Sequence, residues 1–407
     1  MALPTNYQAV STVDDVMREV ILPSLREQLA NRLLFYNVFQ RTTKTVKRVG
    51  RDFAALMSIR TQHNQSVGNR EQAGVLPTHG ASAYDQITVT LARSYGRGAI
   101  DGALLTSPMQ GGASVIGGQL QAEMSSLART MEVDHARQIQ GDGSGALCRI
   151  ETTGTTGDTF TVDDPRYLEP GMRIDSYTAK TAGSQNLDSE IIEDVDYTTG
   201  VVTMETSGAW DTNDYVFRED NRGLEINGLQ AAVDDGTVVA TYQGQSRASS
   251  SIFKGNLSDG DDAAMSINML LTAYNVSRKV ANIEPNFIGS DLDSQRYYAV
   301  LQQARTRFVN ELTLASGHTG LEFAGGSKRI GWFADHFFPE GYTYFLHTPN
   351  FAFFEANQIE YMDKTGSNLH LIQDYDMYEF ILTHYWQLGC DRSNCQTRLY
   401  NYADPTS

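Results

Sequence analysis

Residues Phe53 to Leu91 read FAALMSIRTQHNQSVGNREQAGVLPTHGASAYDQITVTL, and their pattern is the most informative in the chain. Both of its ends alternate apolar residues with polar or small ones, which is typical of a strand with one buried face. The alternating apolar positions are Phe53, Ala55, Met57, Ile59, Ile87, Val89 and Leu91. Between the two ends, residues 63–82 are mostly polar and contain three glycines. We therefore predict a long two-stranded hairpin with an extended tip.

A two-stranded arm of this length is only marginally stable alone in water, so we expect it to lie on another surface. In an enzyme, such a hairpin would be a flap over the active site. In an assembly, it would reach across a neighbouring subunit.

An amphipathic arm is predicted before the hairpin. Asp14 and Asp15 follow Ser11 and Thr12, as at the start of a helix. Apolar residues then recur at helical spacing on both sides of Pro23, at Val13, Met17, Val20, Ile21, Leu25, Leu29, Leu33 and Leu34. The apolar stripe must pack either on the chain's own core or on a neighbouring subunit.

After the hairpin, Ser114 to Gln140 runs without proline and carries a single apolar stripe. The stripe consists of Ile116, Leu120, Met124, Leu127 and Met131. At 1.5 Å per residue, the predicted helix would span roughly 40 Å. It could be a structural spine or a plain core helix, and both have the same shape.

Residues 148–220 have a different character. Short strands are predicted at 160–162, 172–177, 191–197, 201–205 and 215–218, with a hairpin turn at Gly200. This segment carries 5 Lys and Arg against 16 Asp and Glu. We predict an inserted small β-barrel or sandwich whose acidic face is solvated.

The rest of the chain is predicted to be α+β. Helices are expected at about 261–280 and around Tyr297, Val300 and Leu301. Strands are expected at 286–289, 342–346, 369–372, 377–381 and 397–402.

Charge is unevenly distributed over the 407 residues. The formal net charge is -17, which disfavours specific DNA recognition because gripping duplex DNA requires a basic surface. The local exception lies between residues 41 and 60, where six cations face only Asp52. They are Arg41, Lys44, Lys47, Arg48, Arg51 and Arg60.

Enzyme motifs are absent from the sequence. Residues 320–328 (GLEFAGGSK) resemble a phosphate loop superficially, but two residues separate the second invariant-type Gly325 from Lys328. No GxGxxG, GxSxG or HExxH motif occurs. We predict no catalytic residue, metal ligand or cofactor.

Two acidic clusters and the three cysteines are the remaining candidates for a metal site or a catalytic site. Residues 259–262 (DGDD) could bind calcium, but a solvated loop that caps the following helix is favoured. Glu190, Glu193, Asp194 and Asp196 could include an acid and base pair, but solvated strand charges are favoured. Cys148, Cys390 and Cys395 lack a CxxC pair and are expected to be buried thiols in a reducing cytoplasm.

No run of about 18 apolar residues occurs, and the N-terminal residues lack the pattern of a signal peptide. We therefore expect no contact with a membrane.

The order of these elements resembles the Hong Kong 97-type fold of the major capsid proteins of tailed bacteriophages. Residues 284–289 (EPNFIG) look like the strand that enters that family's axial domain, and residues 328–341 (KRIGWFADHFFPEG) are the second local match. The resemblance implies a division into an N-terminal arm (1–50), an extended loop (51–104), a spine helix and peripheral domain (105–147), an inserted acidic β-rich domain (148–220), an axial domain with peripheral segments (221–385) and a C-terminal return strand (386–407).

The resemblance also implies a function. The chain would assemble as hexamers and pentamers into an icosahedral shell around double-stranded DNA, in a virion made in the host cytoplasm. Its partners would be itself, a scaffolding protein that is separate or already removed, a portal and a decoration protein. Covalent crosslinks from a lysine on the extended loop are not expected, because residues 52–147 contain no lysine.

Contact residues are predicted for such an assembly, the basic stretch on the ground of its net positive charge. The six cations between residues 41 and 60 would face inward or pair with a neighbour's acids, although solvated arm charges are an equal alternative. Arg70, Glu71 and Arg93 would contact a neighbour from the extended loop.

Two other functions stay open. An encapsulin-type compartment would share the fold and enclose a protein cargo. An acidic cytoplasmic hydrolase would use the hairpin as a flap and the β-rich insertion to bind substrate.

Overall fold

A computed structural model describes residues 34–42, 46–49, 52–101, 113–152, 156–303, 312–313, 319–325, 329–363 and 367–405. The chain forms two compact units, one from residues 1–133 and 232–407 and the other from residues 134–231. The predicted arm helix between residues 13 and 33 and the phosphate-loop-like residues 326–328 lie outside the described residues.

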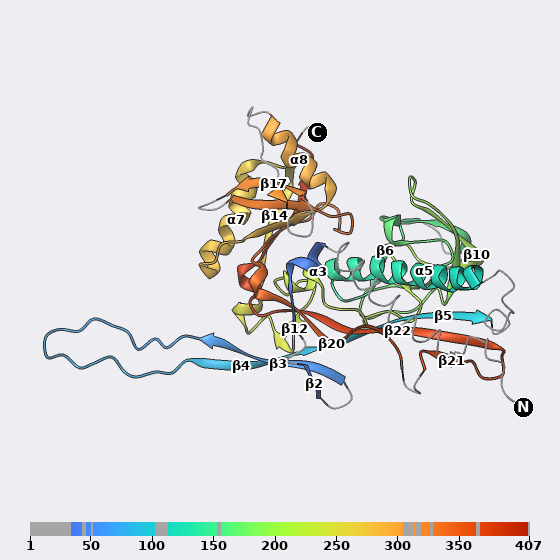
Figure 1. The fold of residues 1–407 in the computed structure, drawn as a ribbon. Coiled ribbons are helices and arrows are strands. Elements are labelled where there is room, and N and C mark those ends of the chain that lie inside the picture. The colour runs from blue at the N-terminus through green and yellow to red at the C-terminus, as the bar shows by residue number, and fades with distance from the viewer. Residues whose placement is uncertain are drawn as a thin grey trace, which may run out of the picture. The chain divides into compact units, whose positions relative to one another are not determined.

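The larger unit contains a five-stranded sheet (Figure 1). Its strands are β1 (Gln40–Thr42), β5 (Ala92–Asp101), β20 (Phe351–Tyr361), β21 (Leu369–Leu371) and β22 (Met377–Cys390). The order is β1-β20-β22-β21, and β5 also pairs with β22. The strands pair antiparallel except β1 and β20, which are parallel.

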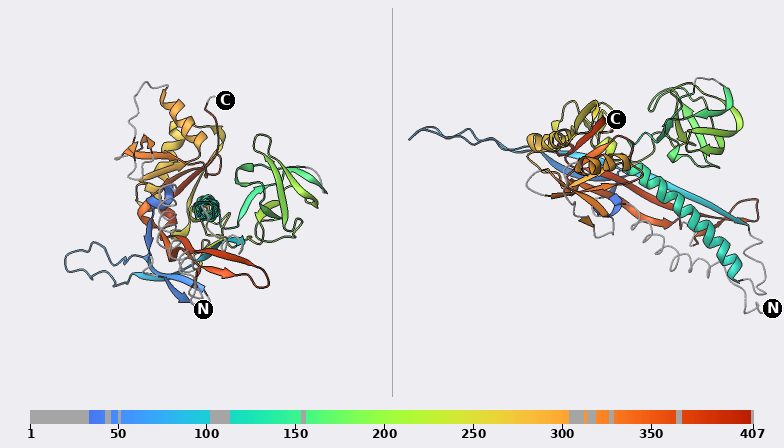
Figure 2. Two further views of the ribbon diagram at one scale, coloured as in Figure 1. Left: turned by 45° about the vertical axis from the view of Figure 1, so that its right-hand side comes forward. Right: turned by 90° about the horizontal axis from the view of Figure 1, so that it is seen from above.

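The predicted long helix is confirmed as α5 (Ala113–Gln140). Two of its side chains pack on the five-stranded sheet. Met124 lies 3.8 Å from the Tyr361 hydroxyl on β20, and Leu127 contacts the position of Gly96 on β5, where a larger residue would crowd it. The right-hand view of Figure 2 shows α5 running alongside these strands.

The predicted hairpin is also confirmed. Strands β2 (Val46–Val49), β3 (Asp52–Gln62) and β4 (Ala83–Thr90) form a three-stranded sheet in the order β2-β3-β4. Met57 lies opposite Ile87 and Ala55 opposite Val89, so the alternating apolar residues share one face. Residues 63–82 form the tip, which continues past the ends of both strands in Figure 1.

A seven-stranded sheet completes the larger unit. Its order is β14 (Asn256–Ala264), β23 (Thr397–Ala403), β19 (Thr343–Leu346), β15 (Phe287–Ser290), β18 (Arg329–Ala334), β17 (Thr319–Ala324) and β16 (Leu312–Thr313). Helices α7 (Ile267–Ala281) and α8 (Leu292–Gln303) contribute Tyr274 and Tyr298 to a core that also contains Trp332 and Phe345. This mixture of helices and sheets confirms the predicted α+β class.

The helix predicted from residue 261 is wrong over its first residues. It begins at Ile267, where the Ser266 hydroxyl accepts the backbone N–H of Met269 at 3.2 Å. Residues 259–262 therefore do not cap this helix. They lie in β14, which pairs with β23 at residues 256–259 and 263–264 with an irregularity between, and this long-range pairing overrides the local helical pattern.

The short elements are α3 (Leu34–Val38), α6 (Leu229–Ala232), β12 (Thr241–Tyr242), β13 (Gln245–Ser246), η2 (Pro165–Tyr167), η3 (Ser251–Phe253), η4 (Thr348–Asn350) and η5 (Ser393–Cys395).

The smaller unit is a β-barrel. Its strands are β6 (Ala146–Arg149), β7 (Thr156–Thr161), β8 (Arg173–Tyr177), β9 (Glu190–Asp196), β10 (Val201–Ala209) and β11 (Tyr215–Arg218), in the order β6-β11-β8-β9-β10-β7. A bridge between Ile150 and Val162 joins the two outer strands, so the sheet closes on itself. Its interior holds Phe160, Trp210 and other buried apolar residues.

The strands predicted between residues 160 and 218 all lie in this barrel, and β6 was not predicted. The turn between β9 and β10 is confirmed at Gly200, which has a φ of 72°. A side chain is disfavoured in that conformation, and the backbone N–H of Gly200 donates to the Asp196 carbonyl at 2.8 Å.

Candidate assembly surfaces

The hairpin tip exposes large apolar side chains. Val67, Val75 and Leu76 are 90%, 87% and 81% exposed. A soluble chain rarely presents such side chains together on one projecting segment unless they bind something. The tip is therefore the leading candidate for a contact with another molecule.

Local hydrogen bonds shape the tip. The Asn64 side chain donates to the Gly80 carbonyl at 2.8 Å and joins the two branches where the tip begins. The Arg70 guanidinium donates to the Val75 carbonyl at 2.8 Å, and the Gly74 backbone N–H donates to the Glu71 carbonyl at 2.9 Å. The predicted contact residues Arg70 and Glu71 thus form the turn that presents Val75 and Leu76.

Arg93 lies elsewhere. It is the second residue of β5, at the base of the hairpin, where it pairs with Asp52 of β3 at 2.8 Å. The single carboxylate among the basic residues 41–60 is therefore already neutralised within the chain. Arg93 and Arg70 were predicted together, but the structure places them at opposite ends of the hairpin.

The hairpin base is anchored by an apolar cluster. Ala55, Val89 and Leu91 pack against Phe354 of β20, and Met57 borders them. Phe53 stacks on Tyr385 of β22 with ring centroids 6.0 Å apart. The base is thus fixed to the five-stranded sheet, and the tip extends from this fixed base.

The described basic residues lie on three strands. Arg41 of β1 lies over the Tyr36 ring at 4.6 Å. Lys47 and Arg48 are exposed neighbours on β2, so their side chains point to opposite faces. Arg60 is exposed near the outer end of β3. Lys44 and Arg51 lie outside the described residues.

The arm is anchored where it meets the two sheets. Phe35 contacts Phe287 of β15 and Phe338, and Phe39 stacks on Phe351 of β20 with ring centroids 4.8 Å apart. For these residues, the apolar stripe packs on the chain's own core. This anchor was not predicted from the sequence, although the spacing of aromatic residues in LFYNVF from residue 34 was the available signal.

A buried polar group secures the same anchor. The Tyr36 hydroxyl donates to Glu355 at 2.7 Å, and His384 Nε2 lies 3.7 Å from the same carboxylate oxygen. Burial raises the pKa of Glu355, but the nearby His384, the hydrogen bond from Tyr36 and the charge of Arg41 lower it further than burial raises it. Burial lowers the pKa of His384, so Glu355 is ionised beside a neutral imidazole.

Two of the four acidic residues of β9, Glu190 and Asp196, are engaged in local structure. Asp196 accepts the backbone N–H groups of Thr198 at 2.9 Å and Thr199 at 3.3 Å, and these bonds with the Thr199 hydroxyl lower the pKa of Asp196. Glu190 accepts the Thr206 hydroxyl on the adjacent strand. A general acid needs a raised pKa, so Asp196 lacks the property that the hydrolase interpretation requires.

The thiols and the acidic residues 259–262 of β14 are also structural. Burial raises the pKa of Cys148 and Cys390 well above the usual value for a thiol, and raises that of Cys395 to about 12. Asp259 accepts hydrogen bonds from Tyr400 at 3.2 Å and Asn401 at 3.0 Å. Within the described ranges, no three or more His, Cys, Asp or Glu side chains are grouped to hold a metal ion.

In the part of the chain that the structure covers, no helix has both the length and the apolar character needed to cross a membrane.

No protein-family model matches the chain, and no curated protein is significantly similar to it in sequence. Among solved structures, a protein of the cyanophage A-1(L) capsid matches with a TM-score of 0.50 and 14% identity. The match covers 91% of this chain and 93% of that one. The chain has the fold of a phage capsid protein.

The capsid fold has further neighbours. The capsid of a native GTA particle matches with a TM-score of 0.45 and 8% identity over 98% of this chain and 93% of that one. An encapsulin from Synechococcus elongatus matches with a TM-score of 0.45 and 9% identity over 92% and 89%.

Proposed function

We propose that this chain is the major capsid protein of a tailed phage. It self-assembles as hexamers and pentamers into an icosahedral shell that encloses double-stranded DNA. The exposed apolar tip of the hairpin carries this proposal. Val75 and Leu76 each gain about 1.5–3 kcal/mol when they are buried, and a neighbouring subunit is the partner that every copy meets during assembly.

The geometry of the contact suits rings. The tip of one subunit binds a different surface of the next, which is a heterologous contact, and such contacts close into rings when the rotation per subunit fits. The anchored base holds the tip in a defined direction, so the contact sets the angle between neighbouring subunits.

On this proposal, the capsid fold is of the Hong Kong 97 type. Residues 1–50 are the N-terminal arm and 51–104 the extended loop. Residues 105–147 form the spine helix and peripheral domain, 221–385 the axial domain with peripheral segments, and 386–407 the return strand. The barrel within residues 134–231 contains the inserted domain proposed at 148–220.

The basic residues are assigned to the inner face or to contacts between subunits. Lys47 and Arg48 are the described pair that we assign to this role, because both are exposed on β2. DNA binding of this kind depends on charge and not on base sequence, so the affinity falls as the salt concentration rises. A scaffolding protein, a portal and a decoration protein are the proposed further partners, and assembly takes place in the host cytoplasm.

Negative-stain electron microscopy of the purified chain, with and without the products of neighbouring genes, tests the proposal. Closed shells or uniform rings of five and six subunits support it. Shells filled with a protein and free of nucleic acid would favour an encapsulin-type compartment instead. Small discrete particles under every condition would contradict any shell function and favour the hydrolase function instead.

A further inference from the structure

The turn between β21 and β22 exposes a second group of large apolar side chains. Leu371 ends β21, Met377 begins β22, and Tyr375 lies between them. Their side chains are 62%, 36% and 68% exposed, in that order. The Ile372 backbone N–H donates to the Met377 carbonyl at 2.9 Å and closes the turn. We call residues 371–377 the β21–β22 turn, and its grouped apolar side chains indicate a binding surface.

The β21–β22 turn is also acidic. Asp374 and Asp376 are exposed on either side of Tyr375 in the sequence. Within the described part of the chain, neither carboxylate takes part in a hydrogen bond or an ion pair. Asp101 of β5, which lies opposite Met377, is exposed as well. The surface therefore fits a partner that combines cations with apolar side chains.

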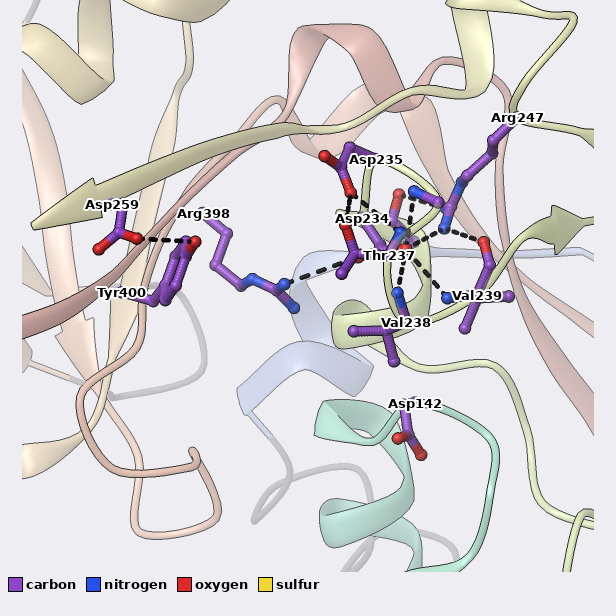
Figure 3. A network of polar contacts seen from close by, with 12 residues as sticks. Asp142, Asp234, Asp235, Thr237, Val238, Val239, Arg247, Asp259, Arg398 and Tyr400 are labelled. Carbon is purple, nitrogen blue, oxygen red and sulfur yellow. Dashed lines mark hydrogen bonds and ion pairs between the residues drawn. The ribbon is translucent and has the colours of Figure 1, made fainter. Parts of the chain in front are cut away.

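Two other acidic residues of the larger unit are engaged within the chain (Figure 3). Asp234 is fully buried, accepts backbone N–H groups and pairs with Arg247 at 3.1 Å. Its second carboxylate oxygen lies 3.7 Å from Arg398 of β23. Asp259 accepts the Tyr400 hydroxyl at 3.2 Å. These carboxylates stabilise the fold, whereas no described residue binds the two carboxylates of the β21–β22 turn.

Strand β2 lies at the opposite end of the same sheet. Strand β22 pairs with β5 from Met377 at one end to Trp386 at the other, a span of roughly 30 Å at 3.3 Å per residue. The extended hairpin leaves the sheet at this second end, away from β21 (Figure 1). Strand β2 is there too, because Val46 packs on the apolar cluster that anchors the hairpin base. The β21–β22 turn therefore cannot reach β2 of its own chain.

Strand β2 offers the complementary surface. Lys47 and Arg48 are exposed on it, and Val49 is 45% exposed. In the part of the chain that the structure describes, β2 pairs with β3 alone, so its other edge is open. A strand edge presents the side chains of both faces together with unpaired backbone groups. A turn that docks on this edge can therefore meet Lys47 and Arg48 at once, although they point to opposite faces.

We propose that the β21–β22 turn of one copy binds the β2 edge of a second copy. The two carboxylates of the turn pair with Lys47 and Arg48, and its apolar side chains cover Val49. A second copy is favoured over DNA, because an exposed valine adjoins the cations and because every copy carries the matching acids. The contact joins two different surfaces, so it runs head to tail and closes into rings when the rotation per subunit fits. It rests on the proposed capsid function and uses no residue of the hairpin tip.

Carbodiimide crosslinking of the full-length chain under assembly conditions, read by mass spectrometry, tests the contact. The carbodiimide activates a carboxylate, and a lysine amine that touches it displaces the activating group to form an amide. In a mixture of unlabelled and isotope-labelled copies, we expect peptides that join Lys47 of one label to Asp374 or Asp376 of the other. Glu193 and Asp194 are exposed on β9 and are the internal control, since neither should link to Lys47. Links within one copy alone, or no link, would overturn the contact.

Charge reversal gives a second reading of the same contact. Asp374→Asn with Asp376→Lys should raise the concentration needed for light-scattering particles at least about tenfold, because a lysine then meets the cations of β2. Asparagine is used at position 374 because Asp374 has a φ of 68°, which asparagine tolerates. Adding Lys47→Glu with Arg48→Gln to the same chain should restore the wild-type threshold to within about threefold. A combined variant as impaired as the turn variant would show that the two surfaces do not meet.

The matched control is Glu193→Gln with Asp194→Lys, which makes the same change of charge in the barrel and should leave the threshold unchanged. The crosslink separates the contact from the proposed function. Linked copies in small oligomers that never close would support the contact and contradict the capsid function. Closed shells without the link would contradict the contact alone, and a chain that stays monomeric would contradict both.

Discussion

Phe380 of β22 lies directly opposite Gly98 of β5, and its ring occupies the space where a side chain at position 98 would stand. An added β-carbon would overlap three atoms of that ring. The two strands therefore pair closely because one position has no side chain and its partner has a large one. This relationship fixes β5 to the sheet that carries the extended hairpin.

Gly98→Ala should lower the free energy of unfolding of the larger unit by about 1–3 kcal/mol, because the new methyl group forces the Phe380 ring or the strand to move. Urea denaturation followed by tryptophan fluorescence measures this change. Gly68→Ala is the control, since an added β-carbon there meets only the end of the Arg70 side chain. Equal midpoints for the two variants would mean that the strands pair without the close approach described.

Replacing the apolar tip should block assembly without unfolding the chain. In Val75→Ser with Leu76→Ser, we expect the concentration needed to form particles to rise at least about tenfold, since burial of either side chain is worth more than 1.4 kcal/mol. Light scattering against protein concentration measures this threshold. Gln65→Ser with Gln72→Ser changes two exposed polar residues of the same tip and should not move it. If the Val75→Ser, Leu76→Ser variant assembles at the same concentration as the wild type and the polar control, the tip does not carry the contact.

Removing the basic residues should affect assembly or packaging. Lys44→Ser, Lys47→Ser and Arg48→Ser together should reduce the yield of particles or their DNA content, and the difference from wild type should shrink as salt is raised. Sedimentation would measure the yield of particles. The ratio of their absorbance at about 260 nm to that at about 280 nm would measure their DNA content. Lys254→Ser with Lys279→Ser removes charge elsewhere and serves as the control. Unchanged yield and DNA content would leave these residues as solvated arm charges.

Acid should weaken the anchor of the arm. The folded pKa values of His384 and Glu355 are both lowered, so the unfolded chain binds more protons and stability falls as pH falls. For His384, the loss begins as pH drops below the unfolded pKa of about 6.5, and for Glu355 below about 4.3.

His384→Gln should therefore flatten the dependence of unfolding free energy on pH between about 7.5 and 5.5, where one histidine can contribute at most about 1.4 kcal/mol per pH unit. Denaturant unfolding at several pH values would show it. Gln65→Ala, at the exposed hairpin tip, should keep the wild-type slope. If the His384 variant keeps it too, the imidazole does not titrate as its burial requires.

The elements with strong local patterns were predictable from sequence. The apolar alternation of β3 and β4, the stripe of α5 and most strands of the barrel were found because each repeats at the period of its own structure. The same holds for the hairpin tip, whose exposure followed from its glycines and polar residues.

The strands that depend on distant partners were not predictable. Strand β5 was missed because Gly96, Gly98 and the charged residues between Ala92 and Asp101 all lower strand propensity. It forms because Leu127 and Phe380 fill the space above the glycines. The first residues of the predicted helix at 261 became β14 for a similar reason, since pairing with β23 outweighs local preference.

The buried ion pair of Asp234 and Arg247 was even less predictable from the sequence. Asp234 begins a DDG sequence that indicates an ordinary turn, and Arg247 and Arg398 are far from it in sequence. Only the folded chain brings the three side chains together.

Cryo-electron microscopy of the assembled particles, at a resolution that traces the hairpin, shows whether the hairpin joins neighbouring subunits of a shell. We predict closed shells in which five and six copies surround each axis and residues 67–76 of every copy lie against a neighbouring subunit, with Val75 and Leu76 buried there. Discrete oligomers, or shells in which the tip contacts no other copy, would contradict the claim that this hairpin builds the shell.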